Sequence, residues 1–195
     1  MGIVFVEDVE EGSSGSVVGG GEPLVRVYGA VQGLNPGLHG IHVHAAGDIS
    51  NGCASTCEHF DPDITGQHGG LKSEQSKRHA GDWGNLSVPP NGKASFEFLA
   101  PGLTVRSGDR SILGRSVVVH AEADDEGTYD GPNKALQQGS KTTGNSGARV
   151  LCGVIGIARD EECPQAKTTS APFDSPERPF RVSMDRKGRL VSRFS

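Results

Sequence analysis

Apolar and polar residues alternate in several short stretches of the chain, most clearly in Leu24–Val31. Successive side chains of a β-strand point to opposite faces, so such alternation predicts a half-buried strand. The pattern predicts strands at Ile3–Glu7, Leu24–Val31, Leu38–Ala45, Asp82–Val88, Ala94–Leu99, Ser116–Glu122 and Val150–Ala158, with a weaker one at Ser16–Gly19. No segment shows a convincing amphipathic helix. The sequence therefore predicts an all-β chain of about eight short strands, in an antiparallel sandwich or barrel.

Two connections between these strands are too long to be simple turns, Ala46–Gly81 and Ala123–Arg149. Long loops in a compact domain are usually functional, and they need something to hold them, such as metals or a disulfide. Residues 160–195 differ in character, because Pro, Ser, Thr and charged residues dominate there. We expect one domain over residues 1–159 and a disordered C-terminal tail over 160–195.

Composition supports this organisation and excludes several classes of protein. The chain has 29 glycines among 195 residues, about twice the usual share of roughly 7%, which suits turns and shaped loops better than a helical bundle. A net charge of −5 argues against a nucleic-acid groove made by bulk charge. No apolar run approaches the ~18 residues that span a bilayer, and residues 1–8 lack the basic start of a signal peptide. We expect a cytoplasmic protein without membrane or nucleic-acid partners.

Histidines on two predicted strands are the first candidates for chemistry. His42 and His44 are two residues apart, so a strand would place both imidazoles on one face. His120 follows the apolar run 117–119 of another strand. Each feature alone is more often an ordinary polar strand face or a partly buried histidine. Together they offer three nitrogen ligands, and an all-imidazole set suits copper.

A second set of candidate ligands lies in and just after the first long loop. His59, His68, His79 and Asp82 supply three nitrogens and one carboxylate. This combination suits four-coordinate zinc. Spacing alone does not decide whether His59 belongs to this set or to the set on the strands.

Six motifs make the chain similar to a known family over residues 3–158. They are GIHVHAAGD, CEHF, HGG, RHAGDWGN, VVVHAEADD and GNSGARVLCGVIGIA, in this order along the chain. In these motifs the sequence resembles copper/zinc superoxide dismutase. The resemblance implies an eight-stranded antiparallel Greek-key β-barrel or sandwich, immunoglobulin-like, with two long functional loops.

The resemblance also implies a site with one copper and one zinc per subunit. The copper ligands would be His42, His44, His59 and His120, and the zinc ligands His59, His68, His79 and Asp82. Asp124 would join His42 to His68, whereas His39 would stay outside the metal set and bond to the backbone. The implied activity is disproportionation of superoxide anions to dioxygen and hydrogen peroxide. His59 and Arg149 would be catalytic, and Thr143 would line the channel.

The second long loop departs from the family at the residues that shape the guiding field. A glutamate pair of the family is replaced by Gln137 and Gln138, and Lys141 stands one position before the usual lysine. We expect electrostatic guidance of the anion to keep its sign, with a strength that the sequence does not define.

The cysteines divide into a pair and two single residues. Cys53 and Cys152 match the family's intrasubunit disulfide. Cys57 departs from the family pattern and could compete for that disulfide or for metal, but we predict a free thiol there and at Cys163.

Assembly and an alternative function complete the expectations. Ile49, Leu113, Gly114 and Ile157 keep the apolar character of a family homodimer contact, and a copper chaperone is a further expected partner. The alternative is a dismutase-like copper-binding or copper-delivery module without activity. Its relatives usually lose copper ligands or the active-site arginine, all of which are present here. A purely structural zinc domain would leave the three strand histidines unexplained.

Overall fold

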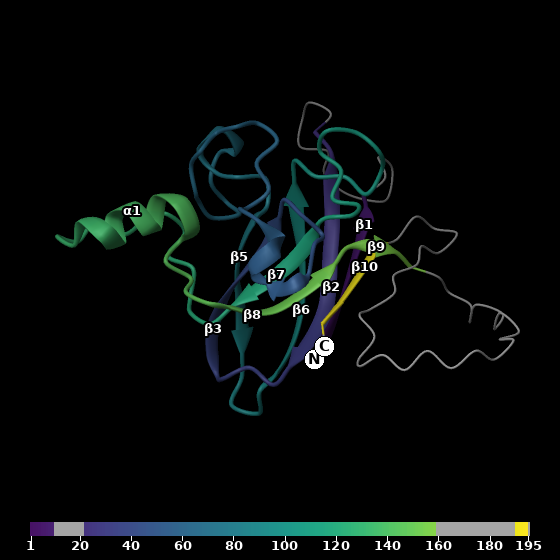
Figure 1. Ribbon diagram of the computed structural model, residues 1–195, viewed down its shortest axis with the longest axis horizontal. Helices are drawn as coiled ribbons and strands as arrows, with labels where there is room; N and C mark the ends of the chain where they lie inside the picture. The colour runs from purple at the N-terminus through teal and green to yellow at the C-terminus, as the bar shows by residue number, and fades with distance from the viewer. Residues whose placement is uncertain (10–21, 159–189, 195) are drawn as a thin grey trace, which may run out of the picture.

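The computed structural model describes residues 1–9, 22–158 and 190–194, and they form two antiparallel sheets packed face to face (Figure 1). The strands are β1 Gly2–Asp8, β2 Leu24–Gln32, β3 Gly37–His44, β4 Ser50–Cys53, β5 Asp82–Val88, β6 Lys93–Pro101, β7 Ser116–His120, β8 Arg149–Val154, β9 Gly156–Ile157 and β10 Leu190–Phe194. The helices are the short η1 Ala54–Thr56 and η2 Gln75–Lys77 and the longer α1 Lys134–Thr143. One sheet has the order β6-β2-β1-β10-β9 and the other β5-β3-β7-β8.

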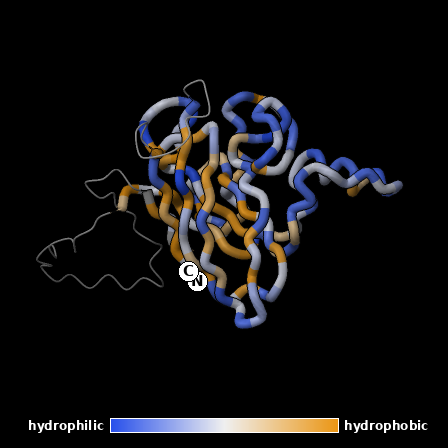
Figure 2. The backbone as a smooth tube through the Cα atoms, turned by 180° about the vertical axis from the view of Figure 1, so that it is seen from behind, coloured by the Kyte–Doolittle hydropathy of each residue, from blue (hydrophilic) through white to orange (hydrophobic). Residues whose placement is uncertain are grey.

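Alternation along the strands builds the core between the two sheets. Val4 and Val6 of β1 and Val25 and Val27 of β2 are fully buried on the inner face of the five-stranded sheet. From the four-stranded sheet, Ile41 and Val43 of β3 and Val117 and Val119 of β7 complete the same cluster. Figure 2 shows apolar positions gathered along the strands and polar positions along α1. The prediction of a Greek-key sandwich is confirmed, and seven of the expected strands are present with small differences in their bounds.

The last predicted strand of the body is interrupted. Ile155, between β8 and β9, pairs with neither sheet. Its N–H donates to the Arg115 carbonyl, and its carbonyl accepts from the Gly114 N–H. The interruption lets β8 pair with β7 in one sheet while β9 pairs with β10 in the other. A single chain segment thus closes one side of the sandwich.

Strand β10 corrects the prediction of a tail outside the fold. Residues 190–194 lie between β1 and β9, and Val191 and Phe194 are buried. The prediction was wrong for these residues because their pairing partners lie far away in the sequence, where composition gives no sign of them. Residues 159–189, and with them Cys163, lie outside the described residues, as does the candidate strand at Ser16–Gly19.

Helix α1 corrects the expectation of a second long connection without a helix. It begins after Asn133, whose side chain accepts from the N–H groups of Ala135 and Leu136, and ends at Gly144 in the left-handed conformation. These are the usual start and stop signals of a helix. Few residues of α1 are apolar, so the sequence shows no apolar face that would predict a helix there. In Figure 1 it extends away from the two sheets. Within the described part of the chain, no helix has the length and apolar character needed to cross a membrane.

Candidate metal centre

The histidines of β3 and β7 lie on the outer face of the four-stranded sheet. Because Ile41 and Val43 point into the core, His42 and His44 point to the opposite face. Both histidines are nevertheless fully buried, and His120 is nearly so. The two long connections cover this face, so the loops exclude water from the site.

Backbone pairing brings the first loop to these histidines. The Phe60 N–H donates to the Val43 carbonyl, the Val43 N–H donates to the Gly81 carbonyl, and His44 and His59 form an isolated antiparallel bridge. A Cβ at Gly81 would lie 2.4 Å from the Val43 carbonyl oxygen, so this approach requires glycine. The loop thereby places His59 beside the strand histidines.

Four imidazoles form what we call the four-histidine group, consisting of His42, His44, His59 and His120. Each offers one nitrogen, and these four atoms lie within 4.8 Å of one another. They are His42 Nδ1 and the Nε2 atoms of the other three, and each is buried without a hydrogen-bond partner in the described part of the chain. Buried polar atoms are rarely left unpaired. Four unpaired nitrogens converging on one point therefore fit a metal ion with imidazole ligands.

Hydrogen bonds to the other ring nitrogens hold these imidazoles in place. His44 Nδ1 donates to the Cys57 carbonyl over 2.7 Å, and His120 Nδ1 to the Gly147 carbonyl over 3.2 Å. His42 Nε2 donates to Asp124 Oδ2 over 2.7 Å. Such contacts fix which nitrogen carries the proton and which is left for a metal.

A second set, the three-histidine–aspartate group, consists of His59, His68, His79 and Asp82. Asp82 Oδ1 lies 2.8, 3.1 and 3.2 Å from the Nδ1 atoms of His59, His68 and His79. A tetrahedral zinc with bonds of about 2.0–2.1 Å would separate its ligand atoms by about 3.3 Å. The spacing of the donor atoms thus fits a zinc-sized tetrahedral site, and His59 contributes one nitrogen to each group.

Asp124 connects the two groups. Its Oδ2 accepts from His42 and its Oδ1 accepts from His68 Nε2 over 2.8 Å. The Asn85 side chain holds the backbone of Asp124 from both sides, since Oδ1 accepts from the Asp124 N–H and Nδ2 donates to the Asp124 carbonyl. A Cβ at Gly144 would lie 1.9 Å from Asp124 Oδ1, so that position requires glycine.

Burial keeps the four-histidine group in the neutral form that binds metals. Desolvation lowers the pKa of His42 to about 3, of His44 to about 2 and of His120 to about 4. It also lowers the pKa of His59. These nitrogen lone pairs are therefore available at neutral pH.

In the three-histidine–aspartate group, neighbouring carboxylates favour the charged form of His68. Burial opposes a charge on His68, but its hydrogen bonds with Asp124 and Asp82 raise its pKa to about 9. Despite their burial, the bonds from the histidines hold the pKa of Asp124 at about 2 and that of Asp82 far below its usual range. In the metal-free chain, His68 is thus a cation between two anions.

Arg78 supports the loop that carries this group. Its side chain is 1% exposed, and Nη1 donates to the carbonyls of His79, Ala80 and Asp82. Nη2 donates to the Pro101 carbonyl at the end of β6. The sequence analysis missed Arg78 and Asn85. Their positions beside His79 and soon after Asp82 were the only available signal, because both side chains bond to backbone groups, which no residue pattern marks.

Arg149 lies at the start of β8, paired in register with His120. Its Nη1 donates to the Cys53 carbonyl over 3.0 Å, to the Ala54 carbonyl over 3.4 Å and to Thr56 Oγ1 over 3.1 Å. The predicted disulfide Cys53–Cys152 is confirmed and ties this segment to β8. Arg149, Cys53 and Ala54 line a hollow in the surface. An always-charged guanidinium in such a hollow suits the docking of a small anion.

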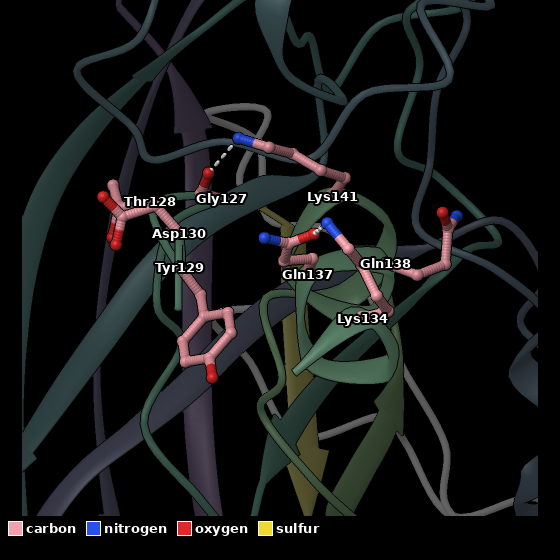
Figure 3. A pocket seen from close by; sticks show the side chains of 8 residues that line it. All are labelled: Gly127, Thr128, Tyr129, Asp130, Lys134, Gln137, Gln138 and Lys141. Carbon is pink, nitrogen blue, oxygen red and sulfur yellow. Dashed lines mark hydrogen bonds between the residues drawn. The ribbon is translucent and has the colours of Figure 1, made fainter. Parts of the chain in front are cut away.

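Residues of the second loop lie around a separate pocket, between Gly127–Asp130 and α1 (Figure 3). Lys141 Nζ donates to the Gly127 carbonyl, and Lys134 Nζ donates to Gln137 Oε1. Thr143 at the end of α1 is exposed, and its hydroxyl donates to the Gly139 carbonyl. Its assignment to the channel therefore stays a prediction, as does guidance by Lys141.

Two further predictions are confirmed in this region. The ring nitrogens of His39 lie 2.8 and 2.9 Å from the carbonyl oxygens of His120 and Asn35, outside both metal groups. Cys57 is a free, exposed thiol, and its backbone has a positive φ of 63°.

Comparison with known proteins agrees with this geometry. The sequence model of the family described as copper/zinc superoxide dismutase matches residues 3–155. Among solved structures, the chain is similar to the clock protein EA4, with 35% sequence identity, a TM-score of 0.63, and coverage of 80% of this chain and 92% of that one.

Proposed function

The chain belongs to the copper/zinc superoxide dismutase family, and from this premise we propose that it disproportionates superoxide. Two superoxide anions and two protons give dioxygen and hydrogen peroxide. The observation that carries the proposal is the convergence of four buried, unpartnered imidazole nitrogens on one point, next to an anion-docking arginine.

The two groups would hold different metals. The four-histidine group would bind one copper, and the three-histidine–aspartate group one zinc. Bound copper would supply the one-electron chemistry that disproportionation needs. His59 would contact both sites, Nε2 in the first group and Nδ1 in the second.

Arg149 and His59 would be the catalytic residues, Arg149 by docking the anion and His59 by transferring a proton. Nη1 of Arg149 is engaged by the 53–56 segment, whereas Nε and Nη2 donate to none of the described residues and are left for an anion. When it is not bound to copper, His59 Nε2 would hold a proton and pass it to the reduced product. Asp124 would keep His42 and His68 in their orientations, and Thr143 would border the channel.

The decisive experiment is superoxide disproportionation by the purified protein with its copper and zinc content measured. Arg149→Ile should lower the rate at least about 10-fold while both metals stay bound, because it removes the anion-docking group and its bonds to the 53–56 segment but no residue of either metal group. Arg106→Ile, at a largely exposed arginine bonded to Asp8, is the matched control. A fully metal-loaded protein without activity would overturn the proposal.

A second reading has a specific observation in its favour. A solved structure with 35% identity is described as a clock protein rather than as an enzyme. Under this reading the chain is a copper-binding or copper-delivery module without activity. The same assay separates the two readings, since the module would bind both metals and leave superoxide unchanged.

We extend the proposal to assembly and location. The apolar residues Leu113 and Ile157 are 41% and 40% exposed and would form a homodimer contact with Ile49 and Gly114. Leu113→Glu should convert the dimer to a monomer in light scattering. We propose that the protein is cytoplasmic and receives copper from a chaperone, which cell fractionation and copper loading with and without the chaperone would test.

Electrostatic guidance is a separate part of the proposal. Screening by salt weakens long-range attraction of an anion, with a Debye length of about 10 Å at 0.1 M. The rate should therefore fall as ionic strength rises. A flat profile would remove the guidance and leave the activity in place.

A further inference from the structure

Strand β10 occupies a slot between two strands to which it has no local connection. It pairs with β1 from Gly2↔Phe194 to Val6↔Leu190 and with β9 at Leu190↔Ile157 and Val191↔Gly156. Both ladders are antiparallel. An extended segment in this slot is thus hydrogen-bonded on both sides, as in recognition by strand addition.

The slot is shaped for the side chains of β10. Phe194 is 3% exposed and belongs to the core cluster. Its Cδ2 would lie 3.1 Å from a Cβ at Gly2, and Val31 Cγ1 would lie at 2.7 Å. Gly2 therefore leaves the space that Phe194 fills.

One buried side chain of β10 opposes binding of the strand in the slot. Ser192 is opposite Val4 on the core side and is fully buried, and its hydroxyl has no hydrogen-bond partner among the described residues. A buried unpaired hydroxyl loses its hydration without compensation. Burial of Ser192 therefore opposes binding of β10 in the slot, and burial of Phe194 favours it.

Chain connectivity does not force the strand into the slot. Ile157 and Leu190 are paired, and a hairpin would join them with two to five residues, but about 30 residues (158–189) separate them. No short hairpin therefore fixes β10 beside β9, and its own contacts with β1 and β9 must hold it in place. Occupancy of the slot is then set by affinity, as for a ligand.

We propose that the slot between β1 and β9 is a strand-binding site whose occupant, the segment Leu190–Phe194, seats and leaves while the rest of the sandwich stays folded. The site recognises a short extended segment with an aromatic residue at its last position. Through β9 the site adjoins β8, the strand that carries Arg149 and Cys152.

Native-state hydrogen exchange on the metal-loaded full chain tests the proposal. Amides of β10 should exchange at least about 10-fold faster than those of β7, because they open without global unfolding. Ser192→Ala should slow the β10 amides about 10-fold by removing the unpaired hydroxyl. Phe194→Ala should speed them about 100-fold, since its core contacts are lost. The amides of β7 serve as the internal control in both variants and should not change.

Exchange of β10 and β7 at one rate, shifted together by both variants, would overturn the proposal. A second experiment adds a peptide of residues 187–195 to a chain that ends at residue 186. The peptide should bind, or restore the fold if the shorter chain has lost it, and its Phe194→Ala version should do neither. A shorter chain that is unaffected by millimolar peptide, whether folded or unfolded, would contradict a binding site.

Discussion

The four-histidine group takes three of its members from strands β3 and β7, whereas the three-histidine–aspartate group takes all of its members from the segment that runs from the first loop to the start of β5. In the first group, ladder register sets the positions of the rings, and the ligand nitrogens stay unpaired. In the second, Asp82 gathers three imidazoles around its own oxygen. Rigid strands can hold mutually unsatisfied ligands apart, whereas a loop needs an attractive centre before the metal arrives.

The largest expected effect is on the carboxylate that gathers the loop. Asp82→Ala removes the carboxylate of the three-histidine–aspartate group and the hydrogen-bond partner of His59 and His79. Zinc affinity should fall by more than the ~100-fold that loss of an outer-shell partner costs. Copper affinity should fall far less, since the strand ligands remain. Competition with a chromophoric chelator measures both, with the exposed Asp130→Ala as control. Equal losses at both sites would show that the groups are not held independently.

Asp124 bonds to one histidine of each group, so a change at Asp124 should affect both groups. Asp124→Asn keeps the size of the side chain but no longer accepts two charged or polar N–H bonds equally. Affinity for both metals should fall about 10–100-fold. Chelator titration of each metal checks this, and a loss at only one site would mean that the bridge does not couple them.

The two histidine groups differ in the number of protons that metal binding displaces from the metal-free chain. The raised pKa of His68, about 9, means that its proton is fully bound at pH 7.5 and is lost as pH rises through 9. Zinc must displace it, so zinc affinity should rise about tenfold per pH unit up to about pH 9 and then level off. The lowered pKa values of His42, His44 and His120 mean that copper displaces no proton from them at this pH.

Calorimetry in buffers of different ionisation enthalpy measures these protons. Zinc added to the metal-free protein at pH 7.5 should release about one proton from His68. Release of none would mean that His68 is already neutral between its two carboxylates.

The smallest expected effect is on the support of Asp124. Asn85→Ala removes two hydrogen bonds to the Asp124 backbone but leaves its carboxylate in place. Unfolding free energy should fall by about 1–3 kcal/mol, at roughly 0.5–1.5 kcal/mol per bond. Metal affinities should fall less than in Asp124→Asn. Thermal or denaturant unfolding with chelator titration checks both, and a larger loss than for Asp124→Asn would make the backbone, not the carboxylate, the critical element.

The sequence predicted most of the strands because their alternation is local. It also predicted the members of the two histidine groups, through His42 and His44 on one strand face and through the resemblance for His59. The same logic could not find β10, whose partners Gly2–Val6 lie at the other end of the sequence. It missed α1 because Asn133 and Gly144 mark its ends while its faces carry little apolar pattern. Asn85 bonds to the backbone of Asp124, 39 residues away, and Arg78 bonds to backbone carbonyls that no residue pattern marks.

The pairing of β1 with β10 also sets an order in time. During synthesis the chain grows at roughly 5–20 residues per second, so β1 waits on the order of 10–40 s before its neighbour Leu190–Phe194 is made. Strands β3, β7 and β8 are complete before then, and so are Arg149 and every member of both groups. The metal centre can thus be assembled on a sandwich still open along β1, and closure of that side comes as a late step in the making of the protein.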